Sequence, residues 1–332
     1  MRWERTCAAA LREELETHVQ GTVSARKPEY QLLRDAAVDI SGGRNEEEWC
    51  AEMSRFMETS HSKMRHAIST DELNELRHFY TDSCILRGLA QSILSLPLQA
   101  VATLDLAIII AGAYGLGRKE FIADAMTRIQ SDIRQDKPFK MPLLALPAKP
   151  CLQYSSRTTI PCLSPPSFLS FQSTFSSAPF ILRKYAQSWP AFTDHPWRSA
   201  RYLRSVAGPG RVVPVEVGAD YRLAEWKQDI ISWDVFLSSL DFEDCPRSTT
   251  NPNVFYLAQH DLMKQFPSLR DDILVPDYVY ASLTAPECPS YRPPLNDEGV
   301  IFNTWLGPEG TISPAHTDPF YNLYGRLPLF ND

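Results

Sequence analysis

A short motif near the end of the sequence, His316-Thr317-Asp318, places an imidazole and a carboxylate two residues apart. In an extended segment, residues i and i+2 point to the same side of the chain. With a second histidine from a distant strand, the pair would form the two-histidine, one-carboxylate face that binds Fe(II) and leaves coordination positions open. The tripeptide alone is a weak signal, because a chance His-x-Asp occurs in roughly a third of chains with this many histidines. A surface turn before Pro319 is the alternative interpretation.

The surrounding sequence strengthens the metal interpretation. Residues 303–319 closely resemble the metal-binding stretch of the Jumonji-C (JmjC) protein hydroxylases. Further segments match that family in order and roughly in spacing, namely residues 189–190, 213–218, 256–260 and 273–278. The resemblance covers about residues 166–325. It is greatest to the JmjC-domain-5 type, whose members are described as arginyl hydroxylases and as histone lysine demethylases and also carry a helical N-terminal domain.

The resemblance implies a role for several residues in an Fe(II)- and 2-oxoglutarate-dependent dioxygenase. His316 and Asp318 would be two of the three iron ligands. Tyr256 would offer its hydroxyl group to a carboxylate of 2-oxoglutarate, the co-substrate. Ser313 lies where the family has a serine or threonine hydroxyl group near that co-substrate.

Two more residues belong to the implied site. Asn322 matches a family asparagine of the same pocket, and Trp305 would line the cavity. Structural alternatives remain for three residues. Tyr256 and Trp305 are also interpretable as core aromatic residues, and Ser313 as part of a turn before Pro314.

The sequence departs from the family after Asn322. The family has a lysine there that pairs with the distal carboxylate of 2-oxoglutarate, whereas this sequence has Gly325-Arg326 and no lysine. No histidine follows Asp318, so the third iron ligand is missing. We therefore expect a C-terminally truncated chain, with an incomplete barrel and with catalysis absent or impaired.

The pattern along the chain predicts an α+β protein. Residues 1–136 have helical periodicity, with helices expected at 3–20, 45–66, 70–80, 98–113 and 118–136. The apolar stretch 98–115 is interrupted by Asp105 and is short for a bilayer-spanning helix, which favours a buried helix. Residues 137–165 are rich in proline and serine, as is typical of a linker.

Residues 166–332 have the mixed pattern of the JmjC domain. We expect strands at 212–217, 254–258, 300–305 and 311–316, and helices at 167–175, 198–207, 223–230 and 233–240. Short strands with Gly/Pro turns favour a jelly roll. The predicted fold is a helical domain followed by an incomplete JmjC/cupin double-stranded β-helix.

Composition excludes some classes of function. The 332-residue chain has a net charge of −7 and no run of Lys or Arg, which argues against a protein that grips nucleic-acid phosphates. Its seven cysteines form no C-x-x-C pair, so a zinc site built from thiolates is not expected. The scattered cysteines favour reduced thiols in an intracellular compartment. We expect no membrane association, with a nuclear or cytoplasmic location, nuclear by the resemblance.

Three functions follow from these observations. The first is an oxygenase that hydroxylates a histone tail or another protein, where hydroxylation of an N-methyl group results in demethylation. The second is a non-catalytic interaction protein that uses its helical domain. The third, a cupin-like metal binder with other chemistry, is disfavoured because the 2-oxoglutarate residues accompany the metal pair.

Overall fold

The computed structural model describes residues 2–18, 28–134, 160–218, 226–242, 244–246, 254–281, 296, 299–308, 311, 313, 316–318 and 320–326. Residues 137–159 of the predicted linker lie outside these ranges. The chain forms two compact units. The first comprises Met1–Met141 with two later segments, Gly208–Pro214 and Ile230–Asp234, and the second comprises Pro142–Ala207, Val215–Asp229 and Val235–Asp332.

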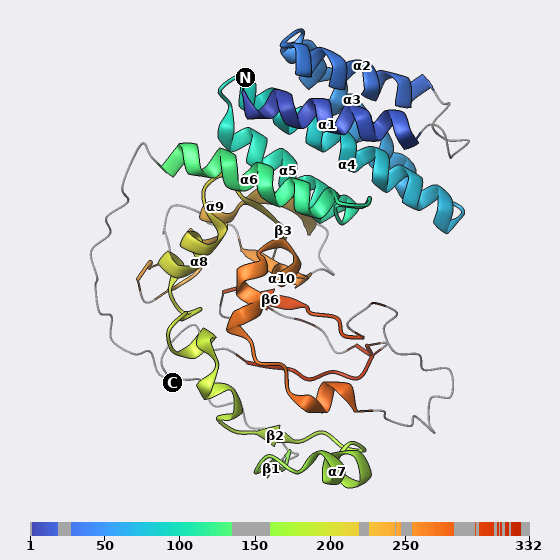
Figure 1. The fold of residues 1–332 in the computed structure, drawn as a ribbon. Helices are drawn as coiled ribbons and strands as arrows, with labels where there is room; N and C mark the ends of the chain where they lie inside the picture. Colours follow the sequence, from blue (N-terminus) through green and yellow to red (C-terminus); the bar gives the residue numbers. More distant parts are fainter. Residues whose placement is uncertain are drawn as a thin grey trace. The chain divides into compact units, whose positions relative to one another are not determined.

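The first unit is built from helices (Figure 1). They are α1 (Trp3–His18), α2 (Pro28–Gly42), α3 (Glu46–Met64), α4 (Thr70–Ile93), α5 (Pro97–Ala111) and α6 (Arg118–Arg134). Helix α3 packs against α4, and α4 packs against α5. Buried side chains of α1 to α6 form one core, which includes Leu11, Leu33, Ile85, Leu104 and Ile122. The predicted helical region is confirmed, and α2 is a helix for which the sequence pattern gave no prediction.

Local sequence signals explain where α4 and α5 begin and end. Ser69 is the N-cap of α4 and accepts a hydrogen bond from the backbone N–H of Glu72. Helix α5 has Pro97 in its first turn and ends at Gly112, whose φ of 68° is the left-handed conformation that glycine adopts without strain. Helix α5 is largely buried in the core, and no described helix has the length and apolarity needed to cross a bilayer.

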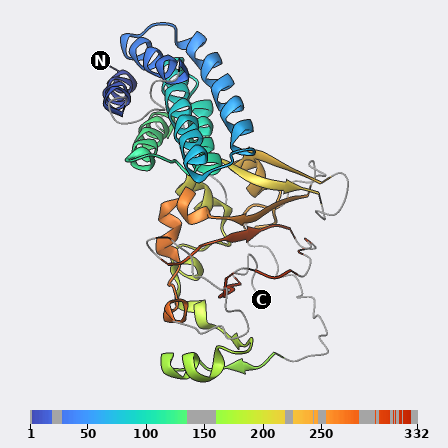
Figure 2. The same cartoon turned by 90° about the vertical axis from the view of Figure 1, so that its right-hand side faces the viewer.

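A four-stranded sheet carries two residues of the predicted site, Tyr256 and Trp305. Its order is β4 (Lys227–Ser232), β3 (Val212–Val217), β5 (Phe255–His260) and β6 (Thr304–Leu306). Strands β3 and β5 pair antiparallel, as do β5 and β6, with a register shift between Leu257 and His260. Figure 2 shows these strands, coloured from yellow to red, side by side.

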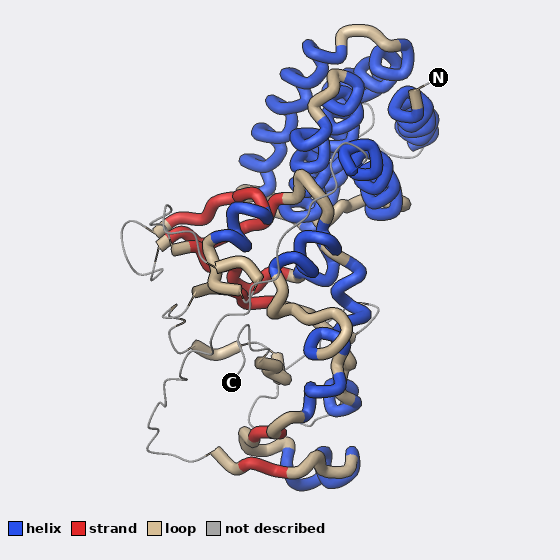
Figure 3. The backbone as a smooth tube through the Cα atoms, turned by 90° about the vertical axis from the view of Figure 1, so that its left-hand side faces the viewer, coloured by secondary structure: helices blue, strands red, loops and turns tan. Residues whose placement is uncertain are grey.

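Short helices and a small parallel pair of strands complete the described part of the chain (Figure 3). The two strands are β1 (Cys162–Leu163) and β2 (Ile181–Leu182). The α-helices are α7 (Phe168–Ser170), α8 (Ala200–Ala207), α9 (Trp233–Ser238) and α10 (Leu262–Gln265). A π-helical turn, η2 (Phe171–Phe175), follows α7, and the 3₁₀-helices are η3 (Tyr185–Ser188), η4 (Pro190–Phe192), η5 (Pro267–Asp272) and η6 (Asp277–Tyr280). The predicted α+β class is confirmed.

Three predicted elements are wrong in whole or in part. Residues 227–232 form strand β4, not the end of a helix at 223–230, because they lie beside β3 in the sheet. The strand predicted at 300–305 is limited to Thr304–Leu306, where β5 supplies a partner. The described residues of 311–316 are not in a strand.

Candidate metal and co-substrate site

Strand β5 presents Tyr256 on the face opposite its buried side chains. Phe255 and Leu257 are buried, while Tyr256 between them is only partly covered. This alternation is the two-residue period of a strand. The Tyr256 hydroxyl lies 3.1 Å from Oγ of Ser313, so the structure brings together the two residues predicted to bind 2-oxoglutarate.

Gly307 makes room for the Tyr256 ring. The Leu257–Leu306 pair of the ladder puts Gly307 next to Tyr256 across the strands. A Cβ atom on Gly307 would lie 2.6 Å from Cδ2 of that ring, closer than a real Cβ contact allows. A side chain at position 307 would therefore displace the tyrosine from its place beside Ser313. Nothing in the sequence pattern indicates this contact between Gly307 and Tyr256.

The environment of Tyr256 keeps its hydroxyl group protonated. Burial raises the pKa of Tyr256, and nearby Tyr324 and Glu216 act in the same direction. The hydrogen bond with Ser313 opposes that rise in pKa. The net direction is upward, so the phenol remains a hydrogen-bond donor at neutral pH.

The motif His316-Thr317-Asp318 brings its two candidate ligands together although it is not in a strand. Nε2 of His316 lies 3.4 Å from Oδ1 of Asp318. The other carboxylate oxygen, Oδ2, accepts a hydrogen bond of 2.5 Å from Nδ2 of Asn322. Asn322 therefore fixes the orientation of the carboxylate and leaves Oδ1 on the side of the histidine.

This pair has the spacing of two neighbouring metal ligands. With bonds of about 2.1 Å, two ligand atoms at adjacent octahedral positions are about 3.0 Å apart. The observed 3.4 Å needs only a small adjustment. Imidazole nitrogen and carboxylate oxygen are also donors that suit Fe(II). The residues present therefore fit two positions of the implied iron site.

The two other described histidines of this domain, His195 and His260, have other partners. Within the described residues, no group of three His, Cys, Asp or Glu side chains is arranged to hold a metal ion. Nε2 of His260 is 2.7 Å from Oε1 of Gln265. Nδ1 of His195 is 2.7 Å from Oδ1 of Asp272.

Trp305 is the remaining candidate residue of β6. Its exposed fraction is 42%, and its neighbours in the strand, Thr304 and Leu306, are partly buried. Because side chains alternate along a strand, Trp305 points away from the face that holds Leu257 and Leu306. It therefore does not belong to the buried core, and it lies on the same face of the sheet as Tyr256.

Asp272 organises a second polar cluster that sequence analysis missed. Its carboxylate is fully buried, and it accepts hydrogen bonds from Nε1 of Trp197 at 2.9 Å and from the Tyr202 hydroxyl at 2.5 Å. The imidazole of His195 contacts the same carboxylate and stacks on the Tyr202 ring. Asp272 thus connects η5 to the segment that contains His195, Trp197 and Tyr202. The only signal in the sequence is a histidine and a tryptophan on either side of Pro196.

Comparison with known proteins places these features in a family. Residues 166–327 match the model of the cupin-like domain. The chain is 38% identical over 177 residues to the Jumonji C domain-containing protein 5 of Drosophila melanogaster, covering 53% of this chain and 40% of that protein. It is 30% identical over 291 residues to lysine-specific demethylase 8 of Danio rerio, covering 82% and 65%. Lysine-specific demethylase JMJ30 of Arabidopsis thaliana is 35% identical over 150 residues, covering 45% and 30%.

These matches confirm the resemblance predicted from the motifs: residues 166–327 match a cupin-like domain, and the relatives are proteins named for the JmjC domain or as lysine-specific demethylases. The matched domain includes Tyr256, Ser313, His316, Asp318 and Asn322. The chain spans 30–65% of the length of these three relatives.

Proposed function

We propose that this chain is an Fe(II)- and 2-oxoglutarate-dependent oxygenase domain that acts on a protein side chain. The observation that carries the proposal is the convergence of His316 and Asp318, with Oδ1 of the aspartate 3.4 Å from Nε2 of the histidine, inside a domain of the JmjC family. Because two relatives are named lysine-specific demethylases, a methylated lysine of a histone tail or of another protein is the substrate class that we infer.

Each residue of the site has a proposed role. His316 and Asp318 would hold the iron, and Asn322 keeps the Asp318 carboxylate turned toward the histidine. Tyr256, protonated and hydrogen-bonded to Ser313, would donate to a carboxylate of 2-oxoglutarate. When bound, iron, 2-oxoglutarate and O2 supply an oxidative decarboxylation that yields succinate and CO2 and hydroxylates a C–H bond. Hydroxylation at an N-methyl carbon gives an unstable hydroxymethyl amine, which releases formaldehyde and leaves the demethylated lysine.

The third iron ligand limits the activity that we expect. The sequence has no histidine after Asp318. A third protein ligand, from elsewhere in the same protein or from another chain, would complete the site. We expect iron binding and turnover by the 332-residue chain alone to be weaker than with that ligand present. A nuclear or cytoplasmic location is part of the same proposal, since a histone or other intracellular protein would be met there.

Succinate formation tests the proposal most simply. The 332-residue chain is incubated with Fe(II), ascorbate, 2-oxoglutarate and peptides that carry methyl-lysine, and succinate is measured by mass spectrometry. We expect a low rate that disappears in a His316→Ala variant and persists in a His260→Ala variant. A measurable rate of succinate formation that is the same in the native chain and in His316→Ala would contradict the assignment of the metal pair.

A second candidate function rests on the first unit. Its helices have a continuous buried core of their own, and this core contains none of the candidate metal ligands. A non-catalytic protein-interaction role for these helices is therefore compatible with a weak or absent oxygenase activity. Unchanged partner binding after His316→Ala would support this role, and loss of binding would count against it.

A further inference from the structure

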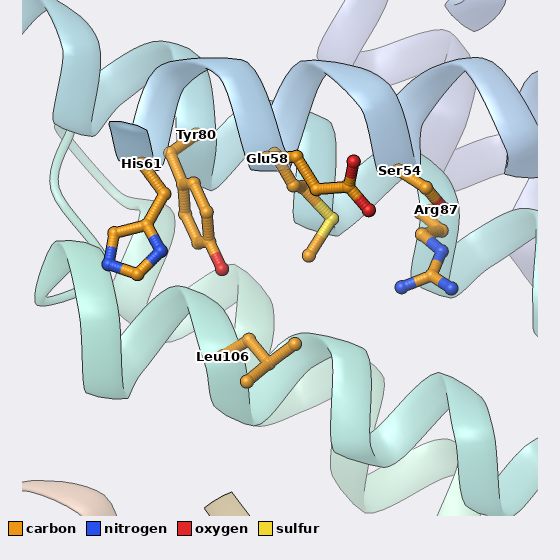
Figure 4. A pocket seen from close by; sticks show the side chains of 7 residues that line it. Ser54, Glu58, His61, Tyr80, Arg87 and Leu106 are labelled. Carbon is orange, nitrogen blue, oxygen red and sulfur yellow. The ribbon is translucent and has the colours of Figure 1, made fainter. Parts of the chain in front are cut away.

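A cavity of about 250 Å³ lies on the helical unit, far in sequence from the metal pair. Helix α3 contributes Met57, Glu58 and His61, α4 contributes Tyr80 and Arg87, and α5 contributes Leu106. Figure 4 shows these side chains around the space between the helices. Neither the family resemblance nor the proposed oxygenase site uses any of them.

The cation of this cavity, Arg87, forms no ion pair with a carboxylate in the part of the chain that the structure describes. In the same part of the chain, the buried Nε of Arg87 has no hydrogen-bond partner. The contact from Nη1 of Arg87 to Oγ1 of Thr103 is long, at 3.4 Å, and the threonine hydroxyl also lies 2.7 Å from Gln91. Among the described residues, no carboxylate forms an ion pair with Arg87. A partly buried guanidinium that has lost hydration without gaining an anion favours a carboxylate ligand.

The wall around Arg87 is apolar. Met57 and Tyr80 are almost fully buried, and Leu106 is partly buried. Burial, assisted by Arg65, lowers the pKa of His61, so the imidazole is neutral at neutral pH. Arg87 is then the positive charge of the cavity. A ligand that fits it has one carboxylate and an apolar stem or apolar neighbours.

The size of the cavity favours a single side chain over a free small molecule. Sites for drug-sized ligands usually have volumes of about 300–1,000 Å³. A volume near 250 Å³ suits one amino-acid side chain with part of its backbone. Glu58, which is exposed on α3, adds a negative charge to the lining and would weaken binding of a carboxylate.

We propose that the cavity between α3, α4 and α5 is a docking site for a glutamate or aspartate of a partner protein. The carboxylate binds Arg87, and apolar residues beside it in the partner contact Met57, Tyr80 and Leu106. The site would bring an acidic, partly apolar peptide segment to the helical unit without iron or 2-oxoglutarate. Peptide binding at this site can therefore be tested independently of the proposed oxygenase activity.

Methyl NMR of the full chain tests the proposal. Met57 lines the cavity, so its labelled methyl group reports on occupancy, and a Met57→Leu variant assigns the signal. The probes are the capped pentapeptide Ala-Leu-Glu-Leu-Ala and its Gln counterpart. We expect the Glu peptide to shift the Met57 signal at millimolar concentration and the Gln peptide to bind at least about tenfold more weakly, as for loss of one charge-assisted bond.

Two substitutions sharpen the test, with one control. Arg87→Gln should weaken binding of the Glu peptide about tenfold or more, and Glu58→Gln should strengthen it a few-fold. Arg55→Gln is the matched control, because Arg55 lies on α3, pairs with Glu52 and does not line the cavity. It should leave the affinity unchanged.

Several results would overturn the proposal. They are equal shifts by the Glu and Gln peptides, no shift of Met57 by the Glu peptide, or unchanged affinity in a folded Arg87→Gln variant. If Arg87→Gln does not fold, Glu58→Gln decides, and unchanged affinity there would count against the proposal. Succinate alone, shifting Met57 as strongly as the Glu peptide, would identify a small-anion site and overturn the peptide assignment.

Discussion

The buried ion pair between Asp105 and Arg211 gives a sharp test of how the first unit is held together. Nε and Nη2 of Arg211 each lie 2.7 Å from an oxygen of Asp105, and the Val212 backbone N–H donates to the same carboxylate at 2.9 Å. Asp105 is fully buried and Arg211 is 8% exposed. The pair therefore anchors segment Gly208–Pro214 on helix α5, within one compact unit.

Asp105→Asn removes the charge and keeps the shape of the side chain. The amide NH2 then faces guanidinium N–H groups, and the buried Arg211 loses the Asp105 carboxylate that it pairs with. Removal of one partner of a buried pair costs about 3–5 kcal/mol of unfolding free energy. For a unit of roughly 150 residues, this corresponds to a fall in melting temperature of about 6–20 °C.

The assay is urea and thermal denaturation followed by circular dichroism, with a matched exposed pair as control. Asp124→Asn breaks the ion pair with Arg128 on α6, in which both side chains are at least half exposed. It should cost about 0.5 kcal/mol or less. The double variant Asp105→Leu with Arg211→Met should recover much of the loss, because both charges of the pair are removed together. A folded Asp105→Asn protein within about 1 kcal/mol of the native chain would refute the reasoning.

Three further predictions concern other parts of the molecule. Gly307→Ala should weaken 2-oxoglutarate binding in calorimetry by displacing Tyr256, and unchanged affinity would contradict the assigned contact. Asp272→Asn should lower the unfolding free energy by about 2–4 kcal/mol, because three polar side chains meet that buried carboxylate, whereas exposed Asp271→Asn should have little effect. The pKa of His61 is lowered in the folded chain, so the unfolded state binds more protons near pH 6 and stability falls as the pH falls through the ordinary His pKa of about 6.5. His61→Gln should reduce the change of the unfolding free energy with pH, measured by chemical denaturation. The same pH dependence in His61→Gln as in the native chain would contradict this prediction.

The helices were largely predictable because their signals are local. Spacing of apolar residues and the cap at Ser69 are properties of neighbouring residues, and the structure confirms the predicted helices around them. Strand β4 was mistaken for a helix because Leu223, Trp226 and Ile230 have helical spacing. Its conformation is instead decided by β3, a partner that the local pattern does not contain.

The candidate site was predictable only as a set of residues. Family motifs indicated Tyr256, Ser313 and the metal pair, and the structure brings Tyr256 to Ser313 and His316 to Asp318. The contacts that position them depend on tertiary structure. The register of β5 and β6 places Gly307 beside Tyr256, which no spacing in the sequence revealed.

Long-range charge partners were beyond the sequence pattern. Asp105 was recognised only as an interruption of an apolar helix, because its partner Arg211 lies 106 residues further along the chain. Arg87 gave no signal at all, because the lack of a carboxylate partner among the described residues depends on how the helices pack. In both cases the burial of the charged side chain is decided by the tertiary structure, and burial strengthens its electrostatic interactions.

The most direct test of the central claim is binding of Fe(II) and 2-oxoglutarate to the purified chain under anaerobic conditions, measured by calorimetry. We expect 2-oxoglutarate to bind only when Fe(II) is present. Both His316→Ala and Asp318→Ala should abolish this Fe(II)-dependent binding. His195→Ala should retain Fe(II)-dependent binding, because His195 belongs to the Asp272 cluster. Metal-dependent binding that survives in both His316→Ala and Asp318→Ala would contradict the assignment of the metal pair.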